Sequence, residues 1–208
     1  MNGTLLVIAK APVPGRVKTR LTPVHTPEEA AALAEAALRD TLDAVLATPA
    51  GRRVLVLDGE PGAWLPAGVD VVPQGGGGLD ERLADAFGLC TGPALLIGMD
   101  TPQVTPALLL QGLELAPGTA AFGPADDGGF WALGLAEPDG RLVRGVPMSS
   151  PDTGAAQRRR LAGAGLAVRE LPGLRDVDTP DDARAVAAAA PGSRFAAALA
   201  GMSAAGAR

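Results

Sequence analysis

Four cationic side chains follow the first apolar segment of the chain, in the sequence LLVIAKAPVPGRVKTRL. Leu5 to Ala9 have the continuous apolar pattern of a buried parallel strand, so the loop from Lys10 to Gly15 lies at a carboxyl end of a sheet. Open α/β sheets bind their ligands at that edge. The loop therefore predicts a polyphosphate site, and a solvated basic loop is the alternative. Its cations are Lys10, Arg16, Lys18 and Arg20.

Aspartates follow two later segments. Asp100 ends the apolar segment of ALLIGMDTP, where a carboxylate at a carboxyl end can hold a divalent cation or cap the helix expected after Thr105. Asp176 and Asp178 alternate along an extended segment of DVDTPDD and so point the same way. Like charges repel unless a cation or hydrogen-bond donors lie between them. Oxygen ligands predict Mg²⁺ or Mn²⁺ at Asp100, Asp176 and Asp178.

Two glycine-rich segments are further candidates. In GPADDGGFWALGL, Asp126 and Asp127 precede Gly128 and Gly129, which allow a substrate to approach the backbone or make a tight hairpin. The following Phe130-Trp131 pair suits stacking on a ligand or core packing. In QGGGGLDERLADAF, a glycine run leads into a helix and either cradles a nucleotide or forms a flexible turn.

Strand-like and helical segments alternate along the chain, as in a parallel α/β sheet. Thr26, followed by Pro27 and two glutamates, predicts the start of a long helix toward Ala47. Further helices are expected from Leu79, after Thr105, over Asp152–Ala164 and over Asp181–Ala190. The expected strands are Thr4–Ala9, Arg53–Asp58, Val69–Val72, Ala94–Gly98, Thr119–Phe122 and Trp131–Leu135.

Composition limits the classes of protein that the chain can represent. Its 208 residues fit a single domain, predicted over residues 1–190, with an Ala/Gly-rich tail over 191–208 that we expect to be flexible. A net charge of −5 argues against a nucleic-acid partner. One cysteine, Cys90, and one histidine, His25, argue against a Cys or His metal centre and a Ser-His-Asp triad. No segment reaches the length of a membrane span, and we predict a cytoplasmic protein.

The five ordered motifs together resemble the DUF2064 family of GT-A-like transferases. That family is related to the guanylyltransferase of coenzyme F420 biosynthesis and, more distantly, to MobA-like nucleotidyltransferases. The resemblance covers roughly residues 4–190 and implies a Rossmann-like nucleotide-diphospho-sugar transferase fold with a mostly parallel central sheet flanked by helices. The motifs are IAKAPVPGRVKTRL, QGGGGLDERLADAF, LLIGMDTP, FGPADDGGFWALGL and DVDTPDDARAV.

The resemblance also implies roles for single residues. Lys18 and Arg20 match a phosphate-binding basic pair, Asp100 matches a metal aspartate, and Asp176 or Asp178 matches the second metal carboxylate. We therefore predict Lys18, Arg20 and Asp100 as catalytic, and Asp126, Asp127, Gly128 and Gly129 as substrate-binding. The predicted nucleotide contacts are Lys10, Gly15, Arg16, Lys18, Arg20, Gly78 and Leu79.

Three functions fit these residues. The first is nucleotidyl transfer from an NTP to a phosphorylated or phosphonate small molecule, with release of pyrophosphate. The second is glycosyl transfer from an NDP-sugar, although GMDTP offers one aspartate where glycosyltransferases of this fold show a DxD pair. The third is a non-catalytic nucleotide-binding protein, which would gain little from opposed charges at strand ends.

Overall fold

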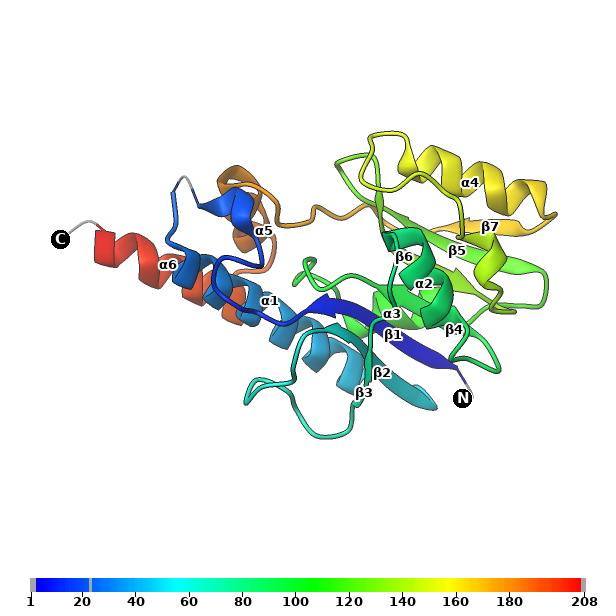
Figure 1. Ribbon diagram of the computed structural model, residues 1–208, viewed down its shortest axis with the longest axis horizontal. Coiled ribbons are helices and arrows are strands. Elements are labelled where there is room, and N and C mark those ends of the chain that lie inside the picture. The colour runs from blue at the N-terminus through cyan, green and yellow to red at the C-terminus, as the bar shows by residue number, and fades with distance from the viewer. Residues whose placement is uncertain (1–2, 23, 207–208) are drawn as a thin grey trace.

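The computed structural model describes residues 3–22 and 24–206. Residues 1, 2 and 23 of the predicted domain, and 207 and 208 of the predicted tail, lie outside the described residues. Figure 1 shows a central sheet with helices against it. The strands are β1 (Thr4–Lys10), β2 (Arg52–Asp58), β3 (Asp70–Pro73), β4 (Ala94–Ile97), β5 (Thr119–Pro124), β6 (Phe130–Leu135) and β7 (Ala167–Glu170). The helices are α1 (Pro27–Ala47), α2 (Leu79–Phe87), α3 (Pro106–Leu113), α4 (Thr153–Gly163), α5 (Pro180–Ala189) and α6 (Arg194–Gly206), with 3-10 turns η1 (Thr19–Leu21) and η2 (Gly140–Leu142).

The sheet has the strand order β3-β2-β1-β4-β6-β5-β7. All neighbouring strands are parallel except β6, which runs antiparallel to both β4 and β5. The short connection containing Asp126 to Gly129 joins β5 to β6, as expected for a hairpin. The prediction of a mostly parallel sheet flanked by helices is confirmed.

Helices cover both faces of the sheet. Successive residues of a strand point to opposite sides, so a central strand such as β1 contributes side chains to both cores. Leu5, Val7 and Ala9 of β1 belong to the core beneath α1 and α3. Leu6 belongs to the core on the other face, where α2 and α4 contribute Leu83 and Leu161. Burial on both faces explains why β1 is a continuous apolar run.

The carboxyl-terminal segment differs from its prediction. Residues 194–206 form α6, which packs along α1 and against α5, to one side of the sheet (Figure 1). Phe195 and Leu199 are buried there, 1% and 9% exposed, against the α1 face that contains Leu33. The Arg194 guanidinium pairs with Asp40 and Asp43 of α1. Two apolar anchors in an alanine-rich sequence therefore hold a helix where low complexity suggested a flexible tail.

Strand β7 was not predicted either. Its sequence AVRE is short and mostly exposed, so it lacks the apolar signal of a buried strand. It adds to the edge of the sheet by pairing in parallel with β5, and the chain then returns toward the centre through an isolated bridge between Ala125 and Leu174. That return brings residues 175–178 to the edge where β1 and β4 end.

The parallel pairing of β1 and β4 aligns their carboxyl ends, with Val7 opposite Ile97. The basic loop after β1 and the segment Gly98–Asp100 after β4 are therefore neighbours. Among the described helices, none combines the length and apolar character that crossing a membrane requires.

Candidate functional site

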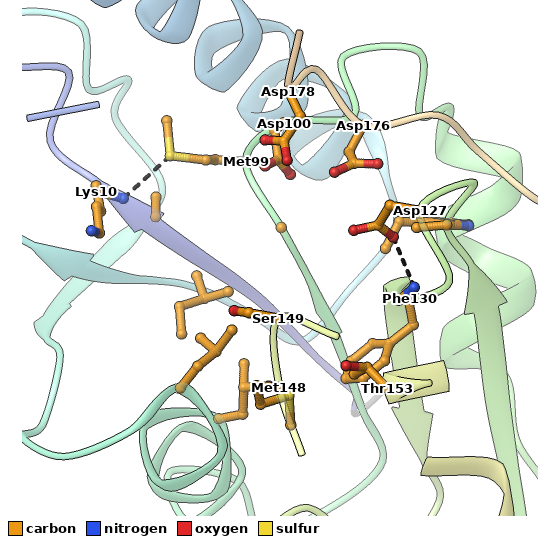
Figure 2. Close-up of a pocket in the computed structure, with 18 of the residues that line it drawn as sticks. Lys10, Met99, Asp100, Asp127, Phe130, Met148, Ser149, Thr153, Asp176 and Asp178 are labelled. Carbon is orange, nitrogen blue, oxygen red and sulfur yellow. Dashed lines mark hydrogen bonds between the residues drawn. The ribbon is translucent and has the colours of Figure 1, made fainter. Parts of the chain in front are cut away.

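A cavity of about 550 Å³ opens at this edge of the sheet. Such a volume suits a small-molecule substrate. Figure 2 shows Asp100, Asp176 and Asp178 gathered at one end, and Met148 toward the opposite end. The structure brings ten of the predicted site residues to its lining: Lys10, Arg16, Lys18, Arg20, Leu79, Asp100, Asp127, Gly129, Asp176 and Asp178.

Lys18 projects into the acidic end of the cavity. Its backbone has φ 49°, a left-handed conformation that is uncommon for a non-glycine residue. The side chain is only 10% exposed, and Nζ lies 2.8 Å from Asp100 Oδ2 and 3.5 Å from Asp178 Oδ1. Burial disfavours the ammonium ion, but the charge and hydrogen bond of Asp100 outweigh that cost and raise the pKa of Lys18. Lys18 is therefore a fixed cation between two carboxylates.

Arg20 reaches the same cluster from the outside. Its Nη1 donates to Asp178 Oδ2 at 2.6 Å, and its side chain is 74% exposed. An exposed guanidinium can exchange this partner for a phosphate at little cost, because surface ion pairs contribute about 0–1 kcal/mol. The predicted basic pair thus stands beside the predicted metal carboxylates.

Asp100, Asp176 and Asp178 form an acidic triad. One ligand oxygen from each lies within 4.8 Å of the others. The backbone N–H of Val177 donates to the Asp100 carbonyl at 3.0 Å and fixes the two segments together. Burial, followed by the charges of Asp100, Asp127 and Asp178, raises the pKa of Asp176 to about 6. Three carboxylates this close are electrostatically unfavourable without a cation.

The triad fits a hard divalent cation. Carboxylate oxygens are the ligands that Mg²⁺ and Mn²⁺ prefer, and the three side chains converge from two segments at one point. Lys18 already supplies one positive charge to this cluster. The described residues at the triad include no cysteine or histidine, so their chemistry does not favour zinc.

The two aspartates of the β5–β6 connection have different partners. Asp127 Oδ1 accepts the Gly129 N–H at 2.7 Å and lies at the cavity (Figure 2). Asp126 points elsewhere, toward Arg175 Nε at 2.9 Å. Gly128 has φ +89°, and a Cβ there would lie 2.2 Å from the Pro151 carbonyl oxygen. This glycine therefore serves the turn and its packing against the segment before α4.

Comparisons with known proteins point to one family. The model of DUF2064, described as an uncharacterized protein conserved in bacteria, matches residues 32–150. A phosphoenolpyruvate guanylyltransferase from Thermomonospora curvata is 37% identical, covering 95% of this chain and 89% of that protein. The chain belongs to the DUF2064 family. A second phosphoenolpyruvate guanylyltransferase, from Geodermatophilus obscurus, is 34% identical over 88% of both chains.

A solved structure has a fold that is consistent with this family. The crystal structure of a candidate nucleotide-diphospho-sugar transferase from Desulfovibrio desulfuricans G20 is 28% identical. It superposes with a TM-score of 0.77 over 86% of this chain and 84% of that one. The predicted fold is confirmed, as is the prediction of a nucleotide-dependent transferase of the nucleotidyltransferase class.

Four predicted site residues of the DUF2064 protein do not line the cavity. Gly15 lies in the turn of the basic loop with φ +75°, and Gly78 is the N-cap of α2. Asp126 pairs with Arg175, and Gly128 serves the turn described above. The sequence signal of the three glycines was that of a flexible or close-approaching backbone, and turns and helix starts produce the same signal.

Sequence reasoning also missed several residues that line the cavity. Gln74 and Arg82 flank the glycine run, and Ser149, Ser150 and Thr153 surround the start of α4. A usable signal existed for Arg82, because positions three and four apart share one face of a helix with Leu79. A Ser-Ser pair before a helix predicts only a cap or a turn, so only the tertiary structure could show that this pair lies at the cavity.

Proposed function

We propose that this protein is a guanylyltransferase that transfers GMP from GTP to the phosphate of phosphoenolpyruvate or a closely similar phosphorylated carboxylic acid. One observation supports the proposal above the others: Lys18, Arg20 and the acidic triad share one cavity at the carboxyl edge of the sheet. That combination suits a polyphosphate and a divalent cation. The names of the curated relatives specify the base and the acceptor.

In the proposed reaction an oxygen of the acceptor phosphate attacks the α-phosphorus of GTP. A new phosphorus–oxygen bond forms between acceptor and GMP, the bond between the α-phosphorus and the bridging oxygen breaks, and pyrophosphate leaves. An acceptor phosphate is already ionised at neutral pH, so no side chain needs to remove a proton from it. Positioning and charge stabilisation are then the main tasks of the protein.

Lys18 and Arg20 carry the charge-stabilising part of the mechanism. Both donate to carboxylates at the acidic end, and both have further N–H groups that can face phosphate oxygens. Lys18 is held rigidly between Asp100 and Asp178, so it is oriented before substrate binds. A preoriented cation stabilises charge that develops on the leaving pyrophosphate without reorganisation during the reaction.

The proposed cofactor is Mg²⁺ or Mn²⁺, held by Asp100, Asp176 and Asp178. When bound there, such an ion would neutralise phosphate oxygens and increase the electrophilicity of the α-phosphorus. Asp127, which already accepts the Gly129 N–H, keeps the acceptor side of the cavity ordered. A cytoplasmic location, where GTP is supplied, is part of the same proposal, and cell fractionation tests it.

The test is a transfer assay with matched acceptors. The protein, GTP, Mg²⁺ and inorganic pyrophosphatase are incubated with phosphoenolpyruvate, 2-phosphoglycerate or glycerol 3-phosphate, and phosphate release and product mass are followed. We expect product with the first acceptor and little with glycerol 3-phosphate, which has no carboxylate. Asp100→Asn should lower the rate by at least about 100-fold, as expected for a residue that supports the electrostatic stabilisation of the transition state.

Asp181→Asn is the control, because its side chain is 82% exposed in α5 and does not line the cavity. It should retain the parental rate. Transfer from an NDP-sugar, with no GTP turnover, would favour the glycosyltransferase alternative. Absence of turnover with every donor would favour a non-catalytic nucleotide-binding protein.

A further inference from the structure

One face of α2 forms the part of the cavity remote from the triad. Leu79, Arg82 and Leu83 lie three and four positions apart, share that face and line the cavity. Ile8 and Met148 add apolar surface nearby, and Figure 2 places Met148 away from Asp100 and Asp178. This end of the cavity therefore combines an aliphatic surface with a single cation from α2. Such a surface suits the binding of a flat heterocycle better than that of a polyphosphate.

The other charges of α2 are directed elsewhere. Glu81 accepts the Gly78 N–H at 2.9 Å, Asp80 accepts the Gly145 N–H at 2.8 Å, and Asp85 pairs with Arg144 at 2.8 Å. Of the four charged residues of α2, only Arg82 lines the cavity. No carboxylate of this helix therefore neutralises the guanidinium there.

Gln74 fixes the orientation of Arg82. Its Nε2 donates to the carbonyl oxygens of Ala9 in β1 at 2.7 Å and of Val56 in β2 at 3.1 Å. Because both partners are acceptors, the amide must present its nitrogen to them and its oxygen to the helix. Oε1 then accepts from Arg82 Nη1 at 2.9 Å.

The Arg82 guanidinium has N–H groups that these contacts do not use. Its Nε lies 3.4 Å from the Gly78 carbonyl oxygen, while Nη2 has no hydrogen-bond partner within residues 3–22 and 24–206. An arginine held at two points, with an unused amino group at a cavity, presents a fixed pair of donors. Guanine matches it, since O6 and N7 are adjacent acceptors on one edge of the base, whereas adenine presents an amino group at the O6 position.

We infer that Arg82, positioned by Gln74, is the residue that selects guanine in this protein. The base packs on Leu79 and Leu83, and the guanidinium donates to O6 and N7. This inference rests on the proposed guanylyltransferase function and specifies how the donor is chosen. Gln74 is a positioning residue, because it acts through the orientation of Arg82.

Nucleotide analogues test the contact atom by atom. Binding of GTP, ITP, 7-deaza-GTP and ATP is measured by calorimetry with Mg²⁺ and no acceptor, on the parent, Arg82→Met and Arg144→Ala. The parent should bind ITP, which retains O6 and N7, within about twofold of GTP. It should bind 7-deaza-GTP roughly 5–10-fold more weakly and ATP at least about tenfold more weakly, given the discrimination of arginine–guanine pairs.

Arg82→Met keeps an aliphatic stem against Leu79 and Leu83 but removes the donors. It should bind GTP about tenfold or more weakly than the parent and no longer distinguish GTP from 7-deaza-GTP. Arg144→Ala is the matched control, an exposed arginine paired with α2 that does not line the cavity, and it should retain the parental pattern. Circular dichroism and thermal unfolding check that each variant is folded.

The inference is overturned if the parent binds GTP and 7-deaza-GTP equally, or if folded Arg82→Met keeps the parental ratio. It is also overturned if Arg82→Met leaves GTP affinity unchanged while raising KM for phosphoenolpyruvate, because Arg82 would then contact the acceptor. Guanylyl transfer with any of these results refutes the inference alone. Selective GTP binding through Arg82 without transfer to any acceptor refutes the proposed function alone, and a failure to bind any nucleotide refutes both.

Discussion

Replacing Asp176 by asparagine should stabilise the protein without metal and weaken its binding of metal. Burial and the charges of Asp100, Asp127 and Asp178 raise the pKa of Asp176 from 3.8 to about 6. At neutral pH the residue is ionised in the folded state at an electrostatic cost that the unfolded chain does not bear. Asparagine has nearly the same shape and no charge, so it removes this cost.

The magnitude follows from the size of the shift. One pKa unit corresponds to about 1.4 kcal/mol, so a rise from 3.8 to about 6 corresponds to about 3 kcal/mol. Partial exposure of Asp176 to solvent reduces this to about 1–2 kcal/mol. For a chain of 208 residues we expect Tm to increase by about 3–6 °C.

The pH dependence has a definite sign. Because the folded-state pKa is the higher one, folded Asp176 binds a proton more tightly than unfolded Asp176, and the parent loses stability as pH rises from about 4 to about 6. Above that range the loss is constant. The advantage of Asp176→Asn should therefore be small at pH 4 and complete by pH 7.

Thermal unfolding with EDTA at pH 4, 5, 6 and 7.5 measures this difference, with Asp181→Asn as an exposed control. Repeating the scans with millimolar Mn²⁺ should reverse the order at pH 7.5, because the parent then gains more from the metal. The reasoning is refuted if Asp176→Asn is less stable than the parent at pH 7.5 in EDTA, or if its advantage does not change with pH.

Two further substitutions test the electrostatics of the triad and the packing of α6. Lys18→Gln should increase Mn²⁺ affinity without nucleotide by at least about fivefold, because it removes a buried cation that contributes at least about 1 kcal/mol at the same oxygens. It should also slow transfer. Weaker Mn²⁺ binding, measured by paramagnetic resonance, would contradict this prediction. Phe195→Ala should lower the free energy of unfolding in urea by about 3 kcal/mol, as expected for a buried phenylalanine, whereas a loss below about 1 kcal/mol would mean that α6 contributes little.

Local chemistry allowed much of the fold to be predicted. Thr26 and Glu29 form a reciprocal capping box at the start of α1, and Pro27 is the first residue of the helix. Four consecutive residues therefore predict this helix start. The buried parallel strands were equally clear, because burial on both faces demands continuous apolar runs such as β1. These signals depend only on neighbours in sequence.

The elements that were missed depend on distant partners. Strand β7 is stabilised by its pairing with β5 and not by its own polar sequence. Helix α6 depends on the surface that α1 and α5 offer to Phe195 and Leu199. Alanine-rich segments are compatible with either a helix or a flexible chain, and contacts elsewhere decide between them.

The same division holds for the candidate site. The sequence by itself determined the participating chemistry: cations after β1, and carboxylates at Asp100, Asp176 and Asp178, which lie next to apolar strands or on an extended segment. Only the tertiary structure decided that carboxylate oxygens of Asp100, Asp176 and Asp178 lie within 4.8 Å of one another, although Asp100 is 76 positions from Asp176. It also placed Lys18 between Asp100 and Asp178. It also decided that Gln74 orients Arg82 toward the cavity. The physical reason is that residue type and local pattern determine the chemistry of a side chain. Strand order, and the path of the chain from β7 back to the centre of the sheet, determine which side chains come into contact.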